Sequence, residues 1–463
     1  MSSPSSASGS RPGAEPGTVR HERWGSRLAF VLAAAGSAVG LGNIWKFPYI
    51  TGENGGGAFV IVYLACIALI GLPILMAEVL IGRRGGHSPA RSMALLARGE
   101  GRSRAWVLVG WSGMIASFVI LSFYSIIAGW AVSYVVHAAS GDFTGAGPER
   151  IGSLFTGLLG SPLQLVAWHT VFMVMTAAVV ARGVRRGLER AVTVLMPGLF
   201  VLLLVLVGYA MTTGAFGRGV AFLFAADFSQ LSTMAVLSAL GHAFFTLSLG
   251  MGIMMAYGSY LPPRTSIAGT AVTVAVMDTV VALLAGLAIF PVVFANNLEP
   301  AAGPGLIFQT LPLAFGQMPG GVLIGSAFFV LLTFAAWTSS ISLLEPTVEW
   351  LQERRGVRRG VAAVGAAAAV WALGIVSALS FNVWSDVSLF GKGLFDLLDF
   401  VTANIMLPLT GLLAAVFAGW AMSRASTKDE LEMGDGPGYR TWRFVIRYVT
   451  PLAVAAVFVH NLL

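Results

Sequence analysis

Charged residues are scarce in this sequence. Asp, Glu, Lys and Arg make up only 11% of its 463 residues, whereas soluble domains average about 25%. The single cysteine, Cys66, excludes a disulfide-stabilised secreted scaffold. Hydrophobic residues account for 56%, and the mean hydropathy is +0.81. Such a chain cannot cover itself in water, so the composition predicts a polytopic membrane protein.

Catalytic and metal-binding motifs are also missing. The six histidines show no metal-ligand spacing, and the sequence contains no Gly-x-Ser-x-Gly motif. These two absences argue against an intramembrane enzyme. The net charge of +7 would suit a nucleic-acid partner, but the positions of the charges point elsewhere.

Eleven apolar stretches have the length of roughly 20 residues that a helix needs to span a bilayer. They cover approximately residues 25–50, 58–81, 105–137, 163–181, 191–213, 231–260, 266–295, 319–350, 360–380, 394–422 and 442–463. We therefore predict an all-α polytopic membrane protein with 11 transmembrane helices.

The positive charges lie mostly on one side of these predicted spans. Of the 28 Lys and Arg residues, 24 fall in the N-terminal tail and in the loops after stretches 2, 4, 6, 8 and 10. The other side has Arg150, Arg218 and Lys392, and Lys46 lies within the first stretch. Because cytoplasmic loops retain positive charge, we expect a multi-pass protein of the inner (plasma) membrane with a cytoplasmic N-terminus. The basic pI then reflects topology, and no nucleic-acid partner is expected.

The N-terminus allows two interpretations. Residues 1–19 are mostly Ser, Pro, Gly and Ala, which is typical of a disordered cytoplasmic tail. Arg20, Arg23 and Arg27 before an apolar stretch would also fit a signal peptide. The stretch continues past Ala35 into a glycine-rich segment, which favours a membrane span, and residues 20–463 are expected to form one transmembrane domain.

Two of the stretches carry glycine clusters that a continuous helix disfavours. Gly36-Ser-Ala-Val-Gly-Leu-Gly-Asn43 interrupts the first stretch, and Thr246-Leu-Ser-Leu-Gly-Met-Gly252 interrupts the sixth. Gly36 and Gly40 could form a helix-packing face instead. However, broken helices five spans apart indicate inverted repeats around a binding site, because an odd number of spans inverts the second unit. We expect a 5+5 inverted repeat, with repeat one at about 25–213, repeat two at about 231–422 and an additional helix at about 442–463.

These segments resemble the neurotransmitter:sodium symporter family, of the bacterial amino-acid type related to the leucine transporter. The similarity runs from about Arg20 to Leu463 and is most specific at Gly36–Pro48, Glu53–Gly57, Phe244–Gly252 and Thr338–Ile341. It implies the leucine-transporter-like fold and a sodium-coupled symporter that imports neutral hydrophobic L-amino acids, including large or aromatic ones, by alternating access. The alternative is a transport-dead amino-acid sensor or a channel-like protein that keeps the same fold.

The resemblance places the substrate at the two helix breaks. Opened half-helices offer N–H groups to a carboxylate and C=O groups to an ammonium or a cation. The apolar Ile120, Phe245, Met251 and Leu343 would surround the substrate side chain, which disfavours a charged one. Tyr124 would contact the carboxylate, although a tyrosine at the membrane interface is the alternative. The implied substrate-binding set is Ser37, Ala38, Leu41, Gly42, Ile120, Tyr124, Phe245, Thr246, Ser248, Met251, Ser339 and Leu343.

Two sodium ions are implied as well, each held by the oxygen ligands that hard cations prefer. The first site would use Ala38, Asn43, Thr246 and Asp278, and the second would use Gly36, Val39, Ala335, Thr338 and Ser339. Both assignments have alternatives. Thr338 and Ser339 could hydrogen-bond to their own helix, and Asp278 could be a protonated helix–helix donor.

Chloride is not expected as a co-ion. Chloride-dependent relatives hold the anion beside the first sodium with a tyrosine, a glutamine, a serine and a hydroxyl of the sixth span. Tyr63 matches, but His242 replaces the glutamine and Ala282 stands at the serine position. Asp278, where the leucine transporter has asparagine, would supply a fixed negative charge instead.

The family pattern also predicts gates on both sides of the substrate. Externally, Lys46 would form a salt bridge with Asp399, although arginine is usual at the position of Lys46. On the cytoplasmic side, Tyr260 matches and Glu353 stands where aspartate is usual. The partner of Glu353 stays open among Arg20, His21 and Arg23. The expected partners of the whole protein are a small amino-acid substrate and the lipid bilayer.

Overall fold

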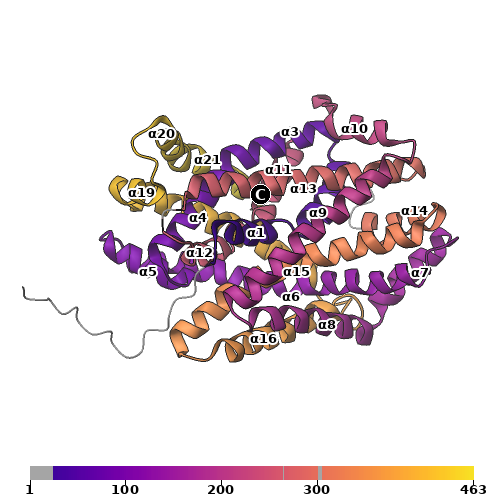
Figure 1. The fold of residues 1–463 in the computed structure, drawn as a ribbon, viewed down its shortest axis with the longest axis horizontal. Coiled ribbons are helices and arrows are strands. Elements are labelled where there is room, and N and C mark those ends of the chain that lie inside the picture. Colours follow the sequence, from indigo (N-terminus) through magenta and orange to yellow (C-terminus); the bar gives the residue numbers. More distant parts are fainter. Residues whose placement is uncertain (1–23, 264, 301–304, 463) are drawn as a thin grey trace, which may run out of the picture.

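The computed structural model describes residues 24–263, 265–300 and 305–462. All eleven predicted stretches fold as helices, and most of these run along the long axis of the molecule (Figure 1). The tail predicted to be disordered lies outside the described residues, as do Arg20, His21 and Arg23.

The first five stretches form the first half of the bundle. They are α1 (Arg27–Ala38) with η1 (Gly42–Lys46) and α2 (Phe47–Glu53); α3 (Gly57–Cys66) with η2 (Ile67–Gly71) and α4 (Leu72–Gly85); η3 (Arg104–Trp106) with α6 (Val107–Ala139); α8 (Pro162–Val180); and η4 (Val184–Glu189) with α9 (Arg190–Ala210).

The remaining six stretches form the second half and the additional helix. They are α11 (Thr233–Thr246) with α12 (Ile253–Ser259); α13 (Ile267–Ala295); α15 (Gly321–Arg355); α16 (Arg359–Leu379); α17 (Leu394–Phe400) with η7 (Val401–Met406), α18 (Leu407–Val416) and η8 (Phe417–Ala421); and α20 (Pro437–Phe444) with η9 (Val445–Val449) and α21 (Thr450–Leu462).

In the described part of the chain, eight helices are long and apolar enough to cross a membrane, or nine if α1 and η1–α2 count as one bent span. The sixth and the eleventh predicted spans are not among these helices. The sixth is divided into α11 and α12, which are too short individually. Inside the bundle, α1 packs against α9, α13 and α15. This packing places the glycine-rich end of α1 in the middle of the protein.

Short elements gather at the two ends of the bundle. One end carries α5 (Pro89–Gly99), α19 (Arg424–Leu431) and α20 (Figure 1). The loops expected to be external contain α7 (Pro148–Gly160), α10 (Phe216–Phe224), η5 (Phe228–Gln230), η6 (Leu306–Thr310), α14 (Leu311–Gln317), and the antiparallel pair β1 (Ser388–Leu389) and β2 (Lys392–Gly393). This two-stranded hairpin is an addition to the all-α prediction.

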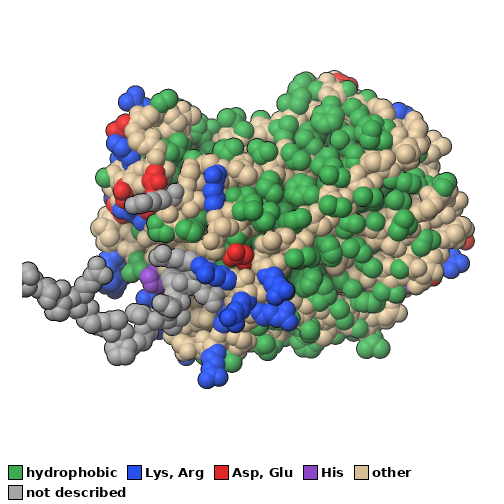
Figure 2. Space-filling view, viewed as in Figure 1, with side chains coloured by type: hydrophobic (Ala, Val, Ile, Leu, Met, Phe, Trp, Pro, Cys, Tyr) green, Lys and Arg blue, Asp and Glu red, His purple; other side chains and the backbone are tan. Residues whose placement is uncertain are grey.

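The surface reflects the charge distribution of the sequence. Hydrophobic side chains cover much of the visible face, while Lys and Arg gather toward the end with α5 and α19 (Figure 2). Leu163 and Leu323 are 80% and 74% exposed, as expected for side chains that contact lipid rather than water. The charge distribution predicts that the basic end faces the cytoplasm.

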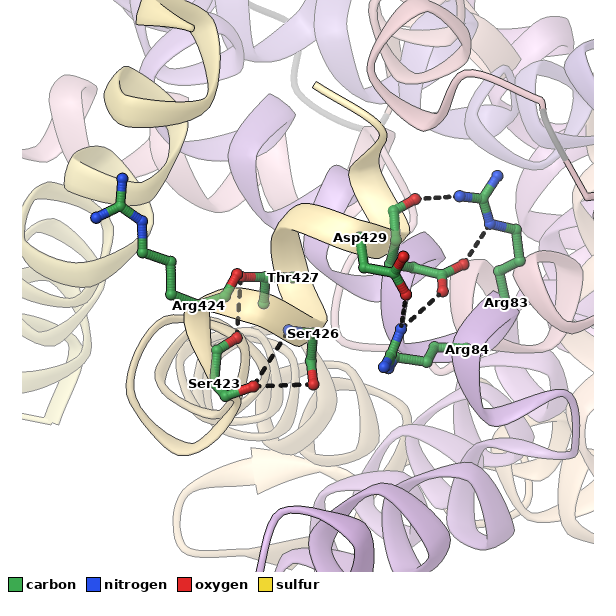
Figure 3. Close-up of polar contacts among 8 residues, drawn as sticks. Arg83, Arg84, Ser423, Arg424, Ser426, Thr427 and Asp429 are labelled. Carbon is green, nitrogen blue, oxygen red and sulfur yellow. Dashed lines mark hydrogen bonds and ion pairs between the residues drawn. The ribbon is translucent and has the colours of Figure 1, made fainter. Parts of the chain in front are cut away.

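Ion pairs fasten the basic end together. Arg83 and Arg84, at the end of α4, reach across to α19 (Figure 3). Arg83 pairs with Glu430, and Arg84 pairs with Asp429 at 3.0 Å and with Glu430 at 3.3 Å. These contacts connect the first and last loops on this side.

Candidate functional site

Both predicted helix breaks are present. Helix α1 ends at Ala38, the chain passes through extended Val39, and η1 begins at Gly42 with a bend of 47° between the two halves. Between α11 and α12, Ser248, Gly250 and Gly252 have φ values of 55°, 74° and 71°. Such values suit glycine and strain a serine. The backbone in both breaks is therefore free of regular helical hydrogen bonding.

A buried carboxylate supports the second break. Oε1 of Glu78, on α4, accepts a hydrogen bond of 2.8 Å from the backbone N–H of Gly250. A Cβ at position 250 would lie 2.4 Å from the carbonyl oxygen of Leu407, so the close approach also requires glycine. Glu78 was not among the predicted site residues. Its signal in the sequence is that it is the only charged residue of the second apolar stretch.

A small cavity of about 20 Å³ lies where the two breaks meet α6 and α15. Eleven of the twelve predicted substrate-binding residues line it, and Gly40 is an additional lining residue. The exception, Thr246, belongs to a neighbouring cluster described below. The lining residues are Ser37, Ala38, Gly40, Leu41, Gly42, Ile120, Tyr124, Phe245, Ser248, Met251, Ser339 and Leu343.

Polar groups concentrate at the helix breaks. The N–H of Leu41 donates to the hydroxyl of Tyr124 at 3.3 Å, so the proton of this hydroxyl remains available to another acceptor. Ser248 donates to the carbonyl oxygen of Ser37 at 3.0 Å, and the two serine hydroxyls lie 3.1 Å apart. The cavity thus has hydrogen-bonding groups at the breaks and apolar side chains from α6, α15 and the second break around the rest.

One oxygen-rich cluster surrounds Asp278 on α13, and we call it the Asp278 cluster. Its carboxylate accepts hydrogen bonds from Asn43 at 2.7 Å, from Thr246 at 2.9 Å and from Tyr63 at 3.3 Å. All four side chains are buried, and they come from η1, α3, α11 and α13. Three of the four residues predicted for the first sodium are therefore together, and the fourth, Ala38, lines the adjoining cavity.

A second cluster, the Ser339 cluster, joins the end of α1 to α15. The hydroxyl of Ser339 donates toward the carbonyl oxygens of Gly36, Ser37 and Val39 at 3.4, 3.1 and 3.4 Å. Thr338 donates to the carbonyl of Ala335 at 3.0 Å, within its own helix. The five residues predicted for the second sodium thus lie together where the end of α1 meets α15. The hydrogen bond of Thr338 also fits the alternative that this hydroxyl only bonds to its own helix.

The predicted external salt bridge is not formed in the described structure. Lys46 Nζ instead lies 4.8 Å from the centre of the Phe245 ring, and no ion pair with Asp399 occurs. Phe245 separates the small cavity from a second one of about 210 Å³, which Lys46 and His242 help to line. In this conformation a cation–π contact holds the ammonium group over the ring, so the salt bridge stays a prediction.

On the side of the cavity opposite Lys46, hydrogen bonds connect the start of α1, the end of α12 and α15. The backbone N–H of Trp24, before α1, donates to the carbonyl of Tyr260 at 3.2 Å. The hydroxyl of Tyr260 donates to Glu345 at 2.9 Å, and Ser259 donates to Glu349 at 2.8 Å. Tyr260 is a predicted gate residue, whereas these two glutamates of α15 are not among the predicted residues.

Glu353 lies one further turn along α15. Its carboxylate accepts from the hydroxyl of Ser88 at 2.5 Å and from the Ser88 N–H at 3.2 Å, just before α5. The partners predicted for Glu353 in the N-terminal segment lie outside the described residues. Nearby, Arg359 of α16 pairs with Glu345 at 2.5 Å.

The residues considered for chloride lie beside the Asp278 cluster. The His242 ring packs against those of Tyr63 and Phe47, with centroid distances of 5.3 and 5.9 Å. Ala282 is fully buried one turn after Asp278 on α13. The hydroxyl of Tyr63 is directed to the Asp278 carboxylate. The Asp278 carboxylate therefore already accepts the hydrogen bond that Tyr63 would donate to a bound anion.

Known proteins resemble this chain over nearly its whole length. Residues 21–145 and 156–463 match the sodium:neurotransmitter symporter family. An uncharacterized sodium-dependent transporter of Bacillus subtilis, YhdH, is 41% identical over 95% of this chain and 97% of its own length. A similar transporter of Haemophilus influenzae is 35% identical over 96% and 98%.

A solved structure also matches. The crystal structure of MhsT in complex with L-phenylalanine superposes with a TM-score of 0.88 and 43% sequence identity, over 95% of this chain and 99% of that one. The fold class predicted from the sequence is thereby confirmed. Together with the family match, these similarities show that the chain belongs to the sodium:neurotransmitter symporter family of multi-span, sodium-dependent membrane transporters, and that it is not an enzyme.

Proposed function

We propose that this symporter imports neutral hydrophobic L-amino acids, with a preference for large or aromatic side chains. The observation that carries the proposal is the cavity at the two helix breaks. Its polar groups match the amino and carboxyl groups shared by all amino acids, and Ile120, Phe245, Met251 and Leu343 leave no charged partner for a substrate side chain. The bound L-phenylalanine of MhsT, a 43% identical protein, supports the same class.

The walls of the cavity must move to admit such a substrate. A volume of about 20 Å³ accommodates roughly one water molecule. Met251 lies between Gly250 and Gly252, and its flexible thioether can repack while the backbone shifts. Phe245, which borders both cavities, would have to swing toward the larger one for a substrate to enter. Alternating access then requires the hydrogen bonds at Tyr260 and Glu353 to open on the other side.

Sodium coupling would arise at the two oxygen clusters. The Asp278 cluster supplies a carboxylate, an amide and a hydroxyl beside the cavity, and the substrate carboxylate would complete its shell. The Ser339 cluster supplies carbonyl and hydroxyl oxygens. One sodium ion moving with a zwitterion across 100 mV would concentrate the substrate roughly fiftyfold even without a sodium gradient.

Chloride independence is part of the proposal. Asp278 would remain ionised when sodium is bound and could take up a proton after sodium leaves. This fixed charge would replace the anion of chloride-dependent relatives. The sodium- and chloride-dependent GABA transporter 2 of Bos taurus is 23% identical to this chain. Replacing chloride by another anion would show whether this chain depends on chloride or uses Asp278 as the fixed charge. The N-terminus would face the cytoplasm, in accordance with the arginine distribution.

The decisive experiment uses the purified protein in liposomes. An inward sodium gradient should drive concentrative uptake of labelled leucine or tryptophan, and replacing sodium by potassium should abolish it. Among the twenty amino acids, the large hydrophobic ones should compete best. Preference for glycine, glutamate or lysine would refute the proposed substrate class, and binding without concentrative uptake would refute transport.

A further inference from the structure

A large cavity lies at the arginine-rich end, apart from the transport site. Its volume is about 510 Å³, and four of its seven lining residues are arginines. The lining residues are Arg424 of α19, Tyr439, Arg440, Arg443 and Phe444 of α20, and Arg447 and Tyr448 of η9. Arg440, Arg443 and Arg447 converge because residues three and four apart share one helix face. The cavity is thus a concentrated positive site, with aromatic residues among the arginines.

Acidic residues compensate only one side of this cavity. Asp435 pairs with Lys428 at 2.5 Å and with Arg424 at 2.9 Å. The hydrogen bond from Lys428, with the other contacts of these two cations, lowers the pKa of Asp435. In Figure 3 the guanidinium group of Arg424 points away from the cluster of Arg83, Arg84 and Asp429. Asp429 and Glu430 of α19 are engaged by Arg84 and Arg83, and Asp435, which follows α19, is engaged by Lys428 and Arg424.

The three arginines that follow α19 have no acidic partner among the described residues. Arg443 donates to the hydroxyl of Thr427 at 2.9 Å and to that of Tyr439 at 3.5 Å. The guanidinium of Arg447 lies 4.1 Å from the centre of the Trp420 ring. Arg440, Arg443 and Arg447 consequently present positive charge that the rest of this part of the protein does not neutralise.

The cavity borders the part of the surface that would contact lipid. Phe444 is 59% exposed, Tyr448 is 43% exposed and Leu452, on the following turn of α21, is 73% exposed. Trp420 is 48% exposed and packs edge-on against Tyr448 at 5.5 Å. Exposed aromatic rings beside arginines are typical of the boundary between headgroups and acyl chains. The positive-inside rule accounts for the side on which these arginines lie, but not for their convergence on one cavity at that boundary.

We propose that this cavity binds the headgroup of an anionic phospholipid from the cytoplasmic leaflet. A phosphodiester accepts paired hydrogen bonds from a guanidinium group. The acyl chains would lie along Phe444, Tyr448 and Leu452. A free phosphate would use the same charges without the apolar contacts, so the adjoining lipid-facing side chains favour the lipid.

Native mass spectrometry of the purified full chain can test this site. The wild type is titrated with phosphatidylglycerol and, separately, with phosphatidylcholine, and should bind the first more tightly. The variant Arg440→Gln/Arg443→Gln/Arg447→Gln should bind phosphatidylglycerol roughly a hundredfold more weakly. The matched control is Arg354→Gln/Arg355→Gln/Arg358→Gln, which removes three exposed arginines from the same side. It should retain the wild-type affinity.

A second variant avoids the internal contacts of Arg443. Arg440→Gln/Arg447→Gln keeps its bonds to Thr427 and Tyr439, and it should weaken binding roughly thirtyfold. Equal weakening in the control triple variant would mean that only net surface charge matters and would overturn the proposal. Equal affinity for phosphatidylcholine, or displacement of the lipid by millimolar inorganic phosphate, would overturn it as well.

Discussion

The two oxygen clusters beside the central cavity are chemically different. The Asp278 cluster is centred on a buried carboxylate that three side chains hold in place. The Ser339 cluster contains carbonyl and hydroxyl oxygens and no carboxylate among its members. A cation in the first cluster would be balanced by a formal charge, whereas one in the second would depend on aligned dipoles. The first should therefore respond to protonation and to nearby ions, and the second to the position of the helices.

The clusters also connect different elements. Ser339 joins α15 to the end of α1, whose following residues form the first break. Asp278 joins α13 to η1, which follows the first break, and to α11, which precedes the second. Sodium in the Ser339 cluster would therefore fix the end of α1 against α15. Sodium in the Asp278 cluster would couple more directly to the substrate, because the substrate carboxylate would complete its ligand shell.

The largest effect is expected when the hydroxyls of the Ser339 cluster are removed. Thr338→Ala together with Ser339→Ala should abolish sodium-dependent substrate binding while the protein remains in the membrane. Hydrogen bonds to charged groups contribute about 1.5–3 kcal/mol each, so losing two comparable ligand contacts predicts at least a hundredfold weaker sodium response. Scintillation proximity binding over a sodium titration measures this.

The matched control for that variant is Thr333→Ala/Ser340→Ala. Both of these hydroxyls also lie on α15 and donate to backbone carbonyls of their own helix, at 2.8 Å each, and Ser340 also contacts the hydroxyl of Thr176 on α8 at 2.8 Å. Sodium affinity should stay near the wild-type value in the control. If the two double variants behave alike, the hydroxyls of Thr338 and Ser339 have only a structural role, and the comparison between the two clusters as ion sites fails.

A smaller but more specific effect is expected at Asp278. Asp278→Asn removes the formal charge and leaves a side chain of the same shape. Uptake should fall roughly tenfold to a hundredfold in chloride-free medium, because the negative charge that would balance the sodium ion is lost. Added chloride should restore part of the activity in the variant only. Uptake into liposomes with chloride or gluconate as the anion tests this expectation.

The wild type provides the control for the anion experiment. Replacing chloride by gluconate should leave its uptake unchanged at saturating sodium. An uptake that collapses in gluconate would contradict the assignment of Asp278 as the fixed charge. So would an Asn variant with wild-type sodium dependence and no response to chloride.

The difference between the clusters also shows what the sequence could predict. The apolar stretches predicted the spans because lipid requires continuous helices with internally satisfied backbones. Glycine-rich breaks predicted the cavity, since Gly250 and Gly252 adopt positive φ values there. Contacts between residues far apart in the chain could not be predicted in the same way. The rule that singled out Asp278 applies equally to Glu78, yet nothing in the sequence shows that Glu78 meets Gly250, 172 positions away.

The gate residues show the same limit. Lys46 and Asp399 have opposite charges at matching positions of the family pattern, which favoured a salt bridge. The side chain of Lys46 is instead directed to the Phe245 ring, and that orientation depends on the packing of η1 against α11. Glu345 and Glu349 are not singled out by the sequence, and only the folded arrangement identifies their partners, Tyr260 and Ser259.

Between the clusters, Tyr124→Phe should have an intermediate effect. The hydroxyl of Tyr124 accepts from the Leu41 N–H and retains a proton for the substrate carboxylate. Losing one such bond predicts a KM for substrate about tenfold higher. Sodium binding in the absence of substrate should change much less, because neither cluster loses a proposed ligand. A calorimetric sodium titration beside uptake kinetics separates these effects, and an equal loss in both would assign Tyr124 to an ion site.

The smallest effect is expected at Lys46, which lies on η1 together with Asn43 of the Asp278 cluster. A partly exposed cation–π contact contributes about 0.5–1 kcal/mol, so Lys46→Met should raise the substrate KM only two- to fivefold through a less restrained Phe245. Asp399→Asn should leave KM unchanged, because in this structure the contact of Lys46 is with the ring. A salt bridge that forms during transport would give a different result. The two substitutions would then have equal effects, their effects would not add in the double variant, and Lys46→Arg would restore the wild-type KM. In either case the sodium response of the Ser339 cluster should be unaltered, since Lys46 is not among the residues that form it.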